Sequence, residues 1–310
     1  MNNSFKVKFR GTRGSYPTPC ADYLKFGGNT SCVEVNVGGN LIILDAGGGI
    51  ITLGDELLRE HILSGNTPQD RKPIKASVIL SHIHQDHIQG LPFFKPLYNN
   101  STTLEIFGLS PNNEDLKSIL SQVLFEKVFP LGLEDISCNF KINNLNERQA
   151  LILNKDKETR IENIENIQNI EFDENDVLIT AHKTFAHPKN GCLCVKIQYQ
   201  GKTLVYATDK ESYKDGDRKF VKFAHDADVL IHDAQYTTEE YSSPISPKQG
   251  FGHSTFEMAI ENAKLAHVKK LYFFHYDPNY NDNILENLEK TYQKLSPNYI
   301  FAKENMEIVL

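Results

Sequence analysis

The chain has 310 residues, of which 40% are hydrophobic, enough to fill a sizeable core in one large or two ordinary domains. It has no apolar run of the ~20 residues that cross a bilayer and no signal-peptide pattern at its start, so we expect a cytoplasmic protein without membrane contact. Five scattered cysteines favour a reducing compartment, and a net charge of −7 disfavours sequence-independent binding to nucleic acid.

Short apolar strands separated by glycine-rich turns make up the first third of the chain. Because each run is rich in β-branched and aromatic residues, we expect strands at 5–11, 31–37, 41–49 and 76–82. Between the last two strands, leucines and an isoleucine recur at helical spacing, which predicts a helix over 53–63.

The segment at about 141–176 is less regular than the rest. It follows an expected strand at 102–108 and an expected helix at 112–125. Its isoleucines recur every three residues from Ile161 to Ile170, which is typical of one face of a helix or of a solvent-facing insertion. The segment contains neither Gly nor Pro.

Strands return in the last third, and each ends in a polar residue that is able to do chemistry. We expect them at 176–187, 192–200, 202–209, 227–236 and 268–278. Helices are expected at 252–266 and 282–295, and Ser254 with Glu257 forms a capping box at the start of the first. Strands interleaved with helices, without a Pro- or Ser-rich linker, predict a single α/β domain over 1–310 with mixed sheets and an insertion at about 141–176.

The stretch SHIHQDHIQG, residues 81–90, contains four side chains that can bind metal: His82, His84, Asp86 and His87. Residues two apart on a strand point the same way, so His82 and His84 can present two imidazoles to one ion where the strand ends. Asp86 and His87 follow where the chain turns, and they are free to reach a second ion. Four such residues within six positions are unusual for ordinary structural or surface residues, so metal binding is the favoured interpretation.

Two metal ions need more than four ligands, and other strand ends supply candidates: His187, Asp209 and His275. Each of these alone would be read as an ordinary surface or turn residue. Together with the cluster they make five His and two Asp without a thiolate, a set that suits Zn, Mn or Fe in a dinuclear hydrolytic site.

The order of these motifs resembles the metallo-β-lactamase superfamily. HIHQDH matches its H-x-H-x-D-H motif, DAG precedes it, and HP, TD, GHST and FHYDP follow in the family's order over about residues 6–280. The resemblance implies an αββα sandwich, with two mixed sheets packed between helices and the site at one edge between the sheets.

The resemblance also implies a role for each candidate ligand. His82, His84 and His187 would hold the first metal, and Asp86, His87 and His275 the second, with Asp209 bridging both. Asp45, in ILDAG, matches a hydrogen-bonding acid rather than a ligand, a sensible role because a ligating imidazole needs an acceptor on its other nitrogen. Zn is expected for the two divalent ions, with Mn or Fe as alternatives.

Within the superfamily, GHST is similar to the motif of the ribonuclease Z-like phosphodiesterase branch. Its histidine, here His253, would assist departure of the leaving oxygen, and Asp233 in HDAQY stands where that branch carries a glutamate. The resemblance thus implies catalytic roles for Asp86, which takes the water proton, and for His253 and Asp233. Stretches such as RGTRGSYPTP and FGGNTSCVEV are more similar to small cyclic-nucleotide phosphodiesterase-like members.

We therefore predict a dinuclear phosphodiesterase that acts on a small or cyclic phosphodiester. One alternative is a tRNA 3′-processing endonuclease of the ribonuclease Z type, which is less favoured because those enzymes carry a Gly- and Pro-rich arm that is not found in this sequence. The other is a non-catalytic metal-binding member of the superfamily. A homodimer is one assembly that the sequence allows.

Four residues are candidate substrate contacts. Phe93 and Phe94, after the metal motif, offer rings on which a base can stack, although such aromatics are more often core. Ser254 and Thr255 begin the capped helix, where free backbone N–H groups can face a phosphate.

Overall fold

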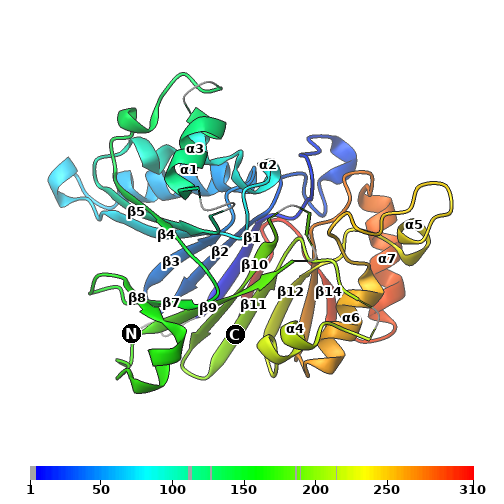
Figure 1. Cartoon of the computed structure of the whole chain (residues 1–310). Helices are drawn as coiled ribbons and strands as arrows, with labels where there is room; N and C mark the ends of the chain where they lie inside the picture. The colour runs from blue at the N-terminus through cyan, green and yellow to red at the C-terminus, as the bar shows by residue number, and fades with distance from the viewer. Residues whose placement is uncertain (1–4, 111–113, 126–127, 186, 189, 214) are drawn as a thin grey trace.

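The structure is a computed structural model, and it describes residues 5–110, 114–125, 128–185, 187–188, 190–213 and 215–310. Within these residues, two mixed β-sheets pack face to face and helices lie on their outer surfaces (Figure 1). The expected αββα sandwich is therefore confirmed.

The first sheet contains seven strands in the order β15, β1, β2, β3, β4, β5, β6. Its parallel part is β3, β4, β5 and β6, and the other pairs are antiparallel. The bounds of the strands are β1 Lys6–Gly11, β2 Cys32–Val37, β3 Asn40–Leu44, β4 Ile74–Leu80, β5 Thr102–Gly108, β6 Asn139–Asn144 and β15 Glu307–Val309.

The second sheet contains eight strands in the order β14, β13, β12, β11, β10, β9, β7, β8. Strands β11 to β14 are parallel to one another, and the remaining pairs are antiparallel. The bounds are β7 Gln149–Leu153, β8 Arg160–Asn163, β9 Val177–Thr184, β10 Cys192–Tyr199, β11 Lys202–Ala207, β12 Val229–Asp233, β13 Lys270–Phe274 and β14 Tyr299–Phe301.

Helices cover the two outer faces. The helix α1 lies with α2 and α3 on the first sheet, while α4, α6 and α7 flank the second (Figure 1). Their bounds are α1 Gly49–Leu63, α2 Gln85–Ile88, α3 Leu116–Leu120, α4 Arg218–Phe223, α5 Thr238–Tyr241, α6 Phe256–Leu265 and α7 Asp282–Gln293.

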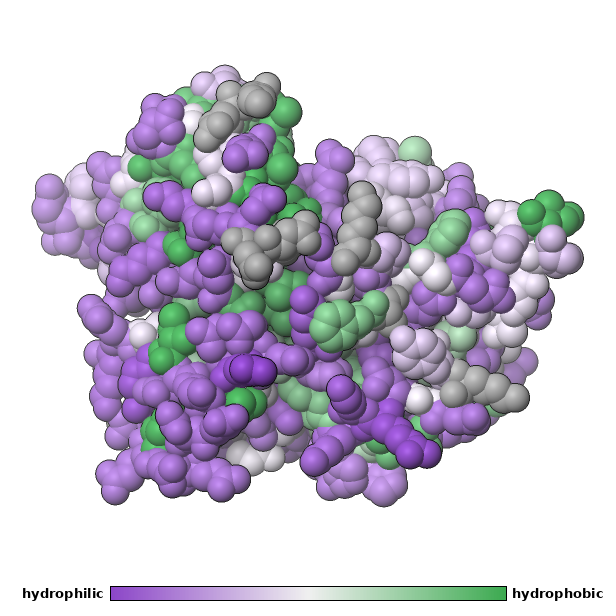
Figure 2. Space-filling view, in the orientation of Figure 1, coloured by the Kyte–Doolittle hydropathy of each residue, from purple (hydrophilic) through white to green (hydrophobic). Residues whose placement is uncertain are grey.

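Apolar side chains from both sheets fill the space between them. Val7 and Phe9 of β1, for example, share one buried cluster with Ile197 of β10 and Tyr206 of β11. The face in Figure 2 is mainly hydrophilic, with hydrophobic side chains near its middle. One buried cluster therefore lies between the sheets, and two others lie between each sheet and the helices that cover it.

The strand directions bring five strand ends to one edge of the sandwich. Strands β3 and β4 are parallel in the first sheet, and β11, β12 and β13 are parallel in the second. In open α/β sheets the carboxyl ends of parallel strands form the edge at which ligands bind. The polar residues predicted to follow these strands are thus carried to a common edge.

Three element predictions need correction. The helix α1 begins at Gly49 rather than at Leu53, and Gly49 lies so close to the Arg10 backbone that a Cβ atom would be 2.4 Å from the Arg10 carbonyl carbon. The helix expected over 112–125 is α3 followed by one π-helical turn, Ser121–Phe125, and residues 112 and 113 lie outside the described part.

The third correction concerns the cap of α6. Thr255, not Ser254, is the N-cap, and its side chain accepts a hydrogen bond from the Met258 N–H. Glu257 instead accepts hydrogen bonds from the hydroxyl groups of Thr238 and Tyr292. The sequence pattern therefore located the helix start to within two residues but assigned the wrong capping partner.

The segment at 141–176 is built into both sheets at their edges. Residues 141–144 belong to β6, while β7 and β8 form an antiparallel pair beside β9. The isoleucine run covers β8 and a 3₁₀ helix, Ile164–Asn169, and Ile161 and Ile164 are exposed. No regular α-helix forms in this segment of the described chain.

Candidate metal centre

The predicted cluster forms just beyond β4. This strand ends at Leu80, so His82 and His84 lie in the following loop rather than on the strand, and α2 carries Asp86 and His87. The rings of His82 and His84 are nevertheless 4.5 Å apart between centroids. The loop therefore presents both imidazoles to one point.

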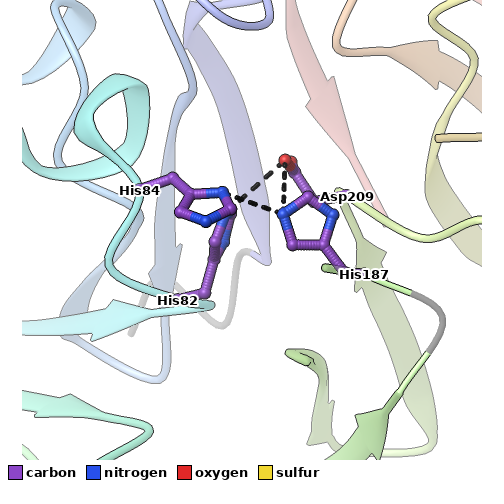
Figure 3. Close-up of side chains that lie close together, drawn as sticks. All are labelled: His82, His84, His187 and Asp209. Carbon is purple, nitrogen blue, oxygen red and sulfur yellow. Dashed lines mark hydrogen bonds and ion pairs between the residues drawn. The ribbon is translucent and has the colours of Figure 1, made fainter. Parts of the chain in front are cut away.

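The first group of ligand atoms comes from His82, His84, His187 and Asp209, and all of these atoms lie within 4.8 Å of one another. His187 Nε2 is 2.9 Å from His84 Nδ1 and 3.8 Å from Asp209 Oδ2. Figure 3 shows the four side chains pointing toward a common centre from separate segments of the chain. This geometry is that of a mononuclear site with three imidazoles and one carboxylate.

The second group comes from Asp86, His87, Asp209 and His275, again within 4.8 Å. His87 Nε2 is 3.3 Å from His275 Nε2, and both nitrogens lie within 3.3 Å of Asp86 Oδ2. Asp209 Oδ1 is 3.0 Å from the His87 nitrogen and 3.1 Å from that of His275.

Asp209 belongs to both groups. Its Oδ1 faces His87 and His275, while its Oδ2 faces His82 at 3.5 Å and His187 at 3.8 Å. One carboxylate with its two oxygens directed to two sets of imidazoles is the arrangement that bridges a pair of cations. The buried clusters are therefore consistent with a dinuclear metal site.

Oxygen acceptors face the outer nitrogens of three imidazoles, which favours a proton on each of these outer nitrogens. His87 Nδ1 contacts Asp45 Oδ2 at 2.8 Å, His187 Nδ1 contacts the Gly252 carbonyl at 3.2 Å, and His275 Nδ1 contacts Gln235 Oε1 at 3.1 Å. If each Nδ1 carries the proton, each Nε2 points a lone pair inward.

Lone pairs facing each other and facing carboxylates require a cation between them. His82 Nε2 is buried and makes no hydrogen bond to any described residue. An unsatisfied buried imidazole nitrogen is costly unless it binds an ion. The residues present thus fit two divalent cations, as the donor set predicts.

The buried charges shift the imidazoles in opposite directions. Burial lowers the pKa of His187 to about 4 and holds the pKa of His82 well below its usual value. Burial also opposes a charge on His87, yet Asp209 and Asp86 raise the pKa of His87 well above the usual value. Positive charge is therefore favoured between these carboxylates.

Asp45 supports the centre from behind. It follows β3 directly and accepts hydrogen bonds from the Ser81 N–H at 2.7 Å, from the Ser81 hydroxyl at 2.8 Å and from the Tyr206 hydroxyl at 2.7 Å. Its Oδ2 also contacts His87 Nδ1 at 2.8 Å. Asp45 is thus a fully buried acceptor behind the candidate ligand His87.

His253 and Asp233 form a separate pair beside the centre. His253 Nδ1 lies 2.7 Å from Asp233 Oδ2 and 4.0 Å from Asp209 Oδ2. Asp233 also accepts hydrogen bonds from the backbone N–H groups of Lys210, Gln235 and Ser254. The shorter aspartate side chain therefore reaches the histidine.

The surroundings favour the protonated form of His253. Burial opposes its charge, but the charge of Asp233 and the hydrogen bond to it raise the pKa of His253 to about 9. The contact with Asp233 thus holds this imidazole in one orientation.

Three of the predicted substrate contacts are buried. Phe94 is fully buried and packs over Gly54 of α1. Ser254 is also buried, since its hydroxyl donates to the Lys210 carbonyl oxygen and its N–H donates to Asp233. Thr255 is used as the helix cap.

A sequence pattern does not show which side of a turn faces solvent, so the burial of these three positions could not be predicted from it. Phe93, in contrast, is largely exposed and packs edge-on against Phe129 with their centroids 5.3 Å apart.

Sequence reasoning missed several residues that position the ligands. Gln235 accepts from His275, Tyr206 donates to Asp45, and the Ser15 N–H donates to Asp86 Oδ2 at 2.7 Å. Gln235 lies in the HDAQY stretch that drew attention to Asp233, so its place in that motif was a signal. Tyr206 and Ser15 carry no such signal, because their contacts join distant parts of the chain.

Three residues of the centre have left-handed backbone conformations. Asp45 has φ 61°, Asp209 has φ 47° and His275 has φ 64°. Such angles are uncommon for residues other than glycine and cluster at functional sites, where the surroundings must impose them. Each of these residues follows a strand by one or two positions.

A sandwich with a His- and Asp-rich centre at one edge defines a metal-dependent hydrolase. The family model of the beta-lactamase superfamily domain matches residues 40–276, and the chain belongs to the metallo-β-lactamase superfamily.

Relatives of known name span nearly the full chain. A ribonuclease Z of Picrophilus torridus is 27% identical over 94% of this chain and 92% of its own length. Among solved structures, the metallo-beta-lactamase fold protein YhfI of Bacillus subtilis has a TM-score of 0.64, with 19% identity and full coverage of both chains. The short form of human tRNase Z has a TM-score of 0.60, with 19% identity over 98% of both chains.

No helix in the described ranges has the length and apolar character that a membrane span requires.

Proposed function

We propose that this protein is a metal-dependent phosphodiesterase that cleaves RNA, the reaction type of its ribonuclease Z relatives. The observation that carries the proposal is the contact of 2.7 Å between His253 and Asp233 beside the shared carboxylate of Asp209. A metal centre alone can hydrolyse many bonds, whereas a buried, protonated imidazole beside it serves a leaving group that needs a proton.

Seven residues would hold the metal ions in this proposal: His82, His84, Asp86, His87, His187, Asp209 and His275. The donor set favours zinc. Two cations bound there would supply positive charge for a phosphate and would lower the pKa of water enough to provide hydroxide as the nucleophile at neutral pH. Asp86, whose carboxylate lies between His87 and His275, is placed to accept a proton from that water.

The departing oxygen is served by His253. Because Asp233 accepts the Nδ1 proton, the proton to be transferred is the one on Nε2 of the imidazolium. As the phosphorus–oxygen bond breaks, this proton passes to the leaving oxygen, which departs as a hydroxyl group. Asp233 stays ionised and stabilises the imidazolium before the transfer.

RNA is the first candidate substrate because relatives named ribonuclease Z align with the chain from end to end, at 24% to 27% identity in the archaeal examples. A small or cyclic phosphodiester is the second candidate. It is favoured by the net charge of −7, and by residues 141–176, which form sheet edges instead of a Gly- and Pro-rich arm.

A substrate screen tests the proposal. Purified protein loaded with Zn or Mn is assayed with 3′-extended precursor tRNA, a cyclic mononucleotide, a cyclic dinucleotide and bis(p-nitrophenyl) phosphate. Cleavage of the tRNA at a defined 3′ position, with kcat/KM above that for the cyclic substrates, is expected. Turnover of the cyclic substrates alone would favour a small or cyclic phosphodiester as the substrate. Metal binding without any turnover would contradict both candidate substrates.

A further inference from the structure

Two exposed phenylalanines lie on the loops that carry His187 and His253. Phe185 follows β9 and precedes His187 by two residues, and it is 76% exposed. Phe251 precedes His253 by two residues and is 52% exposed. Burying such rings is favourable by about 1.5 to 3 kcal/mol each, so a bound ring-shaped partner could gain stability by covering them.

The two loops are in contact with each other at the centre. His187 Nδ1 lies 3.2 Å from the carbonyl oxygen of Gly252, the residue after Phe251. The rings of His187 and His253 are 5.4 Å apart between centroids. The loops that carry Phe185 and Phe251 therefore meet beside His253.

Each of these rings has a lysine above it. Lys183 Nζ is 4.9 Å from the ring centroid of Phe185, and Lys248 Nζ is 5.4 Å from that of Phe251. A cation over an exposed ring contributes only about 0.5 to 1 kcal/mol, which is too little to offset the exposure of the rings. A ring with a neighbouring cation is, however, what a single-stranded nucleotide needs, since the base stacks on the ring and the cation meets a phosphate.

The loop that carries Phe251 is anchored to the centre. Glu211, two residues after Asp209, accepts hydrogen bonds from the Gly250 N–H at 2.8 Å and from the Gly252 N–H at 3.0 Å. The Tyr241 hydroxyl donates to the same carboxylate. The buried Glu211 thus fixes the backbone on both sides of Phe251, whose side chain is exposed.

We propose that Phe185 and Phe251, with Lys183 and Lys248, form a subsite for the nucleotide that departs with the leaving oxygen. The subsite is assigned to the leaving-group side of the centre because His253 protonates the leaving oxygen in the function proposed above. This inference rests on that proposed function. A substrate with a base on its leaving group gains stacking in this subsite, whereas a p-nitrophenyl ester has no nucleotide to place there.

The absence of tryptophan from the sequence allows a direct binding test. In the Phe185→Trp and Phe251→Trp variants the indole is the only one in the chain, and stacking on a base quenches its fluorescence. Each variant also carries His253→Ala, so that the probe is consumed slowly. We expect saturable quenching by a hexa-adenylate RNA and at least fivefold weaker quenching by an abasic oligonucleotide of equal length.

Phe172 offers a matched control. It is an exposed phenylalanine that precedes β9, whereas Phe185 follows β9, and eight strand residues separate the two by about 26 Å. The Phe172→Trp variant should show no base-dependent quenching. Equal quenching by adenylate and abasic probes at Phe185 and Phe251, or the same quenching at Phe172, would overturn the subsite.

Kinetics test the assignment to the leaving side. Phe185→Ala and Phe251→Ala should each raise KM for an RNA substrate about tenfold, within the ~1 to 3 kcal/mol that stacking contributes per base, and should change KM for bis(p-nitrophenyl) phosphate less than twofold. Phe172→Ala should change neither. Equal losses on both substrates would show that the phenylalanines only support the fold.

The binding test separates the two proposals. Base-dependent quenching in a protein that cleaves no phosphodiester would support the nucleotide subsite and contradict the proposed reaction. RNA cleavage without base-dependent quenching would support the reaction and overturn the subsite.

Discussion

Asp209 connects the two halves of the centre through its two carboxylate oxygens. In the Asp209→Asn variant the side chain keeps its size but loses the negative charge that faces four imidazoles. We expect loss of one or both metal ions and a drop in activity of at least 10²-fold, with the fold retained. Metal analysis with circular dichroism measures both, and near-normal turnover with two bound ions would make Asp209 an ordinary turn residue.

Two substrates with different leaving groups test the role of His253 as a proton donor. His253→Ala should keep both metal ions and lose about 10²- to 10⁴-fold on a nucleoside-type phosphodiester, the usual range for general acid catalysis. It should lose far less on bis(p-nitrophenyl) phosphate, whose leaving group needs no proton. Asp233→Asn should show the same contrast more weakly, because Asp233 acts through the imidazole.

Equal losses on the two substrates would contradict the acid role of His253 and favour phosphate binding. Loss of metal from His253→Ala would instead make it a ligand, in place of His187 or His275.

At the scale of elements, the loop after β1 is fitted closely to the centre. A Cβ atom on Gly14 would lie 2.4 Å from Cε1 of His275, and the neighbouring Ser15 N–H donates to Asp86. The loop thus fixes two candidate ligands of the second position from a part of the chain that provides no ligand itself.

Gly14→Ala tests this contact. The added methyl group should displace the His275 ring, so that the second position binds its ion at least tenfold more weakly while the first is unchanged. Gly48→Ala is the control, because its Cβ would meet nothing closer than Asn29 Oδ1 at 3.2 Å. Metal titration measures the effect, and unchanged binding in Gly14→Ala would mean that the loop yields to the methyl group.

At the scale of the whole molecule, the centre joins the two sheets. Asp45, His82 and Asp86 lie in segments that follow strands of the first sheet, whereas His187, Asp209 and His275 follow strands of the second. Ions held between them bind the folded protein and not the unfolded chain, so they stabilise the sandwich as a unit.

Removing the ions should therefore destabilise the fold. At a free metal concentration 1,000-fold above Kd, each independent site contributes about 4 kcal/mol. Each kcal/mol of lost stability lowers Tm by roughly 2 to 4 °C in a large domain. Chelation should therefore lower Tm by about 10 °C or more. Calorimetry with and without chelator measures the change, and a Tm that is insensitive to chelation in wild-type protein would contradict a metal centre between the sheets.

The sequence by itself determined the strands, the helical faces and the dense cluster at 82–87, because these depend on residues that are close along the chain. The alternation and spacing of apolar residues report local geometry, and four ligand-type residues within six positions are informative without any fold. The order of the motifs further assigned the superfamily, and with it the sandwich.

The tertiary structure alone decided which distant residues meet. Asp86 and His275 are 189 positions apart, and their contact depends on both sheets being assembled. The same holds for Tyr206 beside Asp45, for the burial of Phe94 and Ser254, and for the open rings of Phe185 and Phe251. Burial and long-range contacts are set by how the sheets pack, a property of the whole chain that no short stretch of sequence contains.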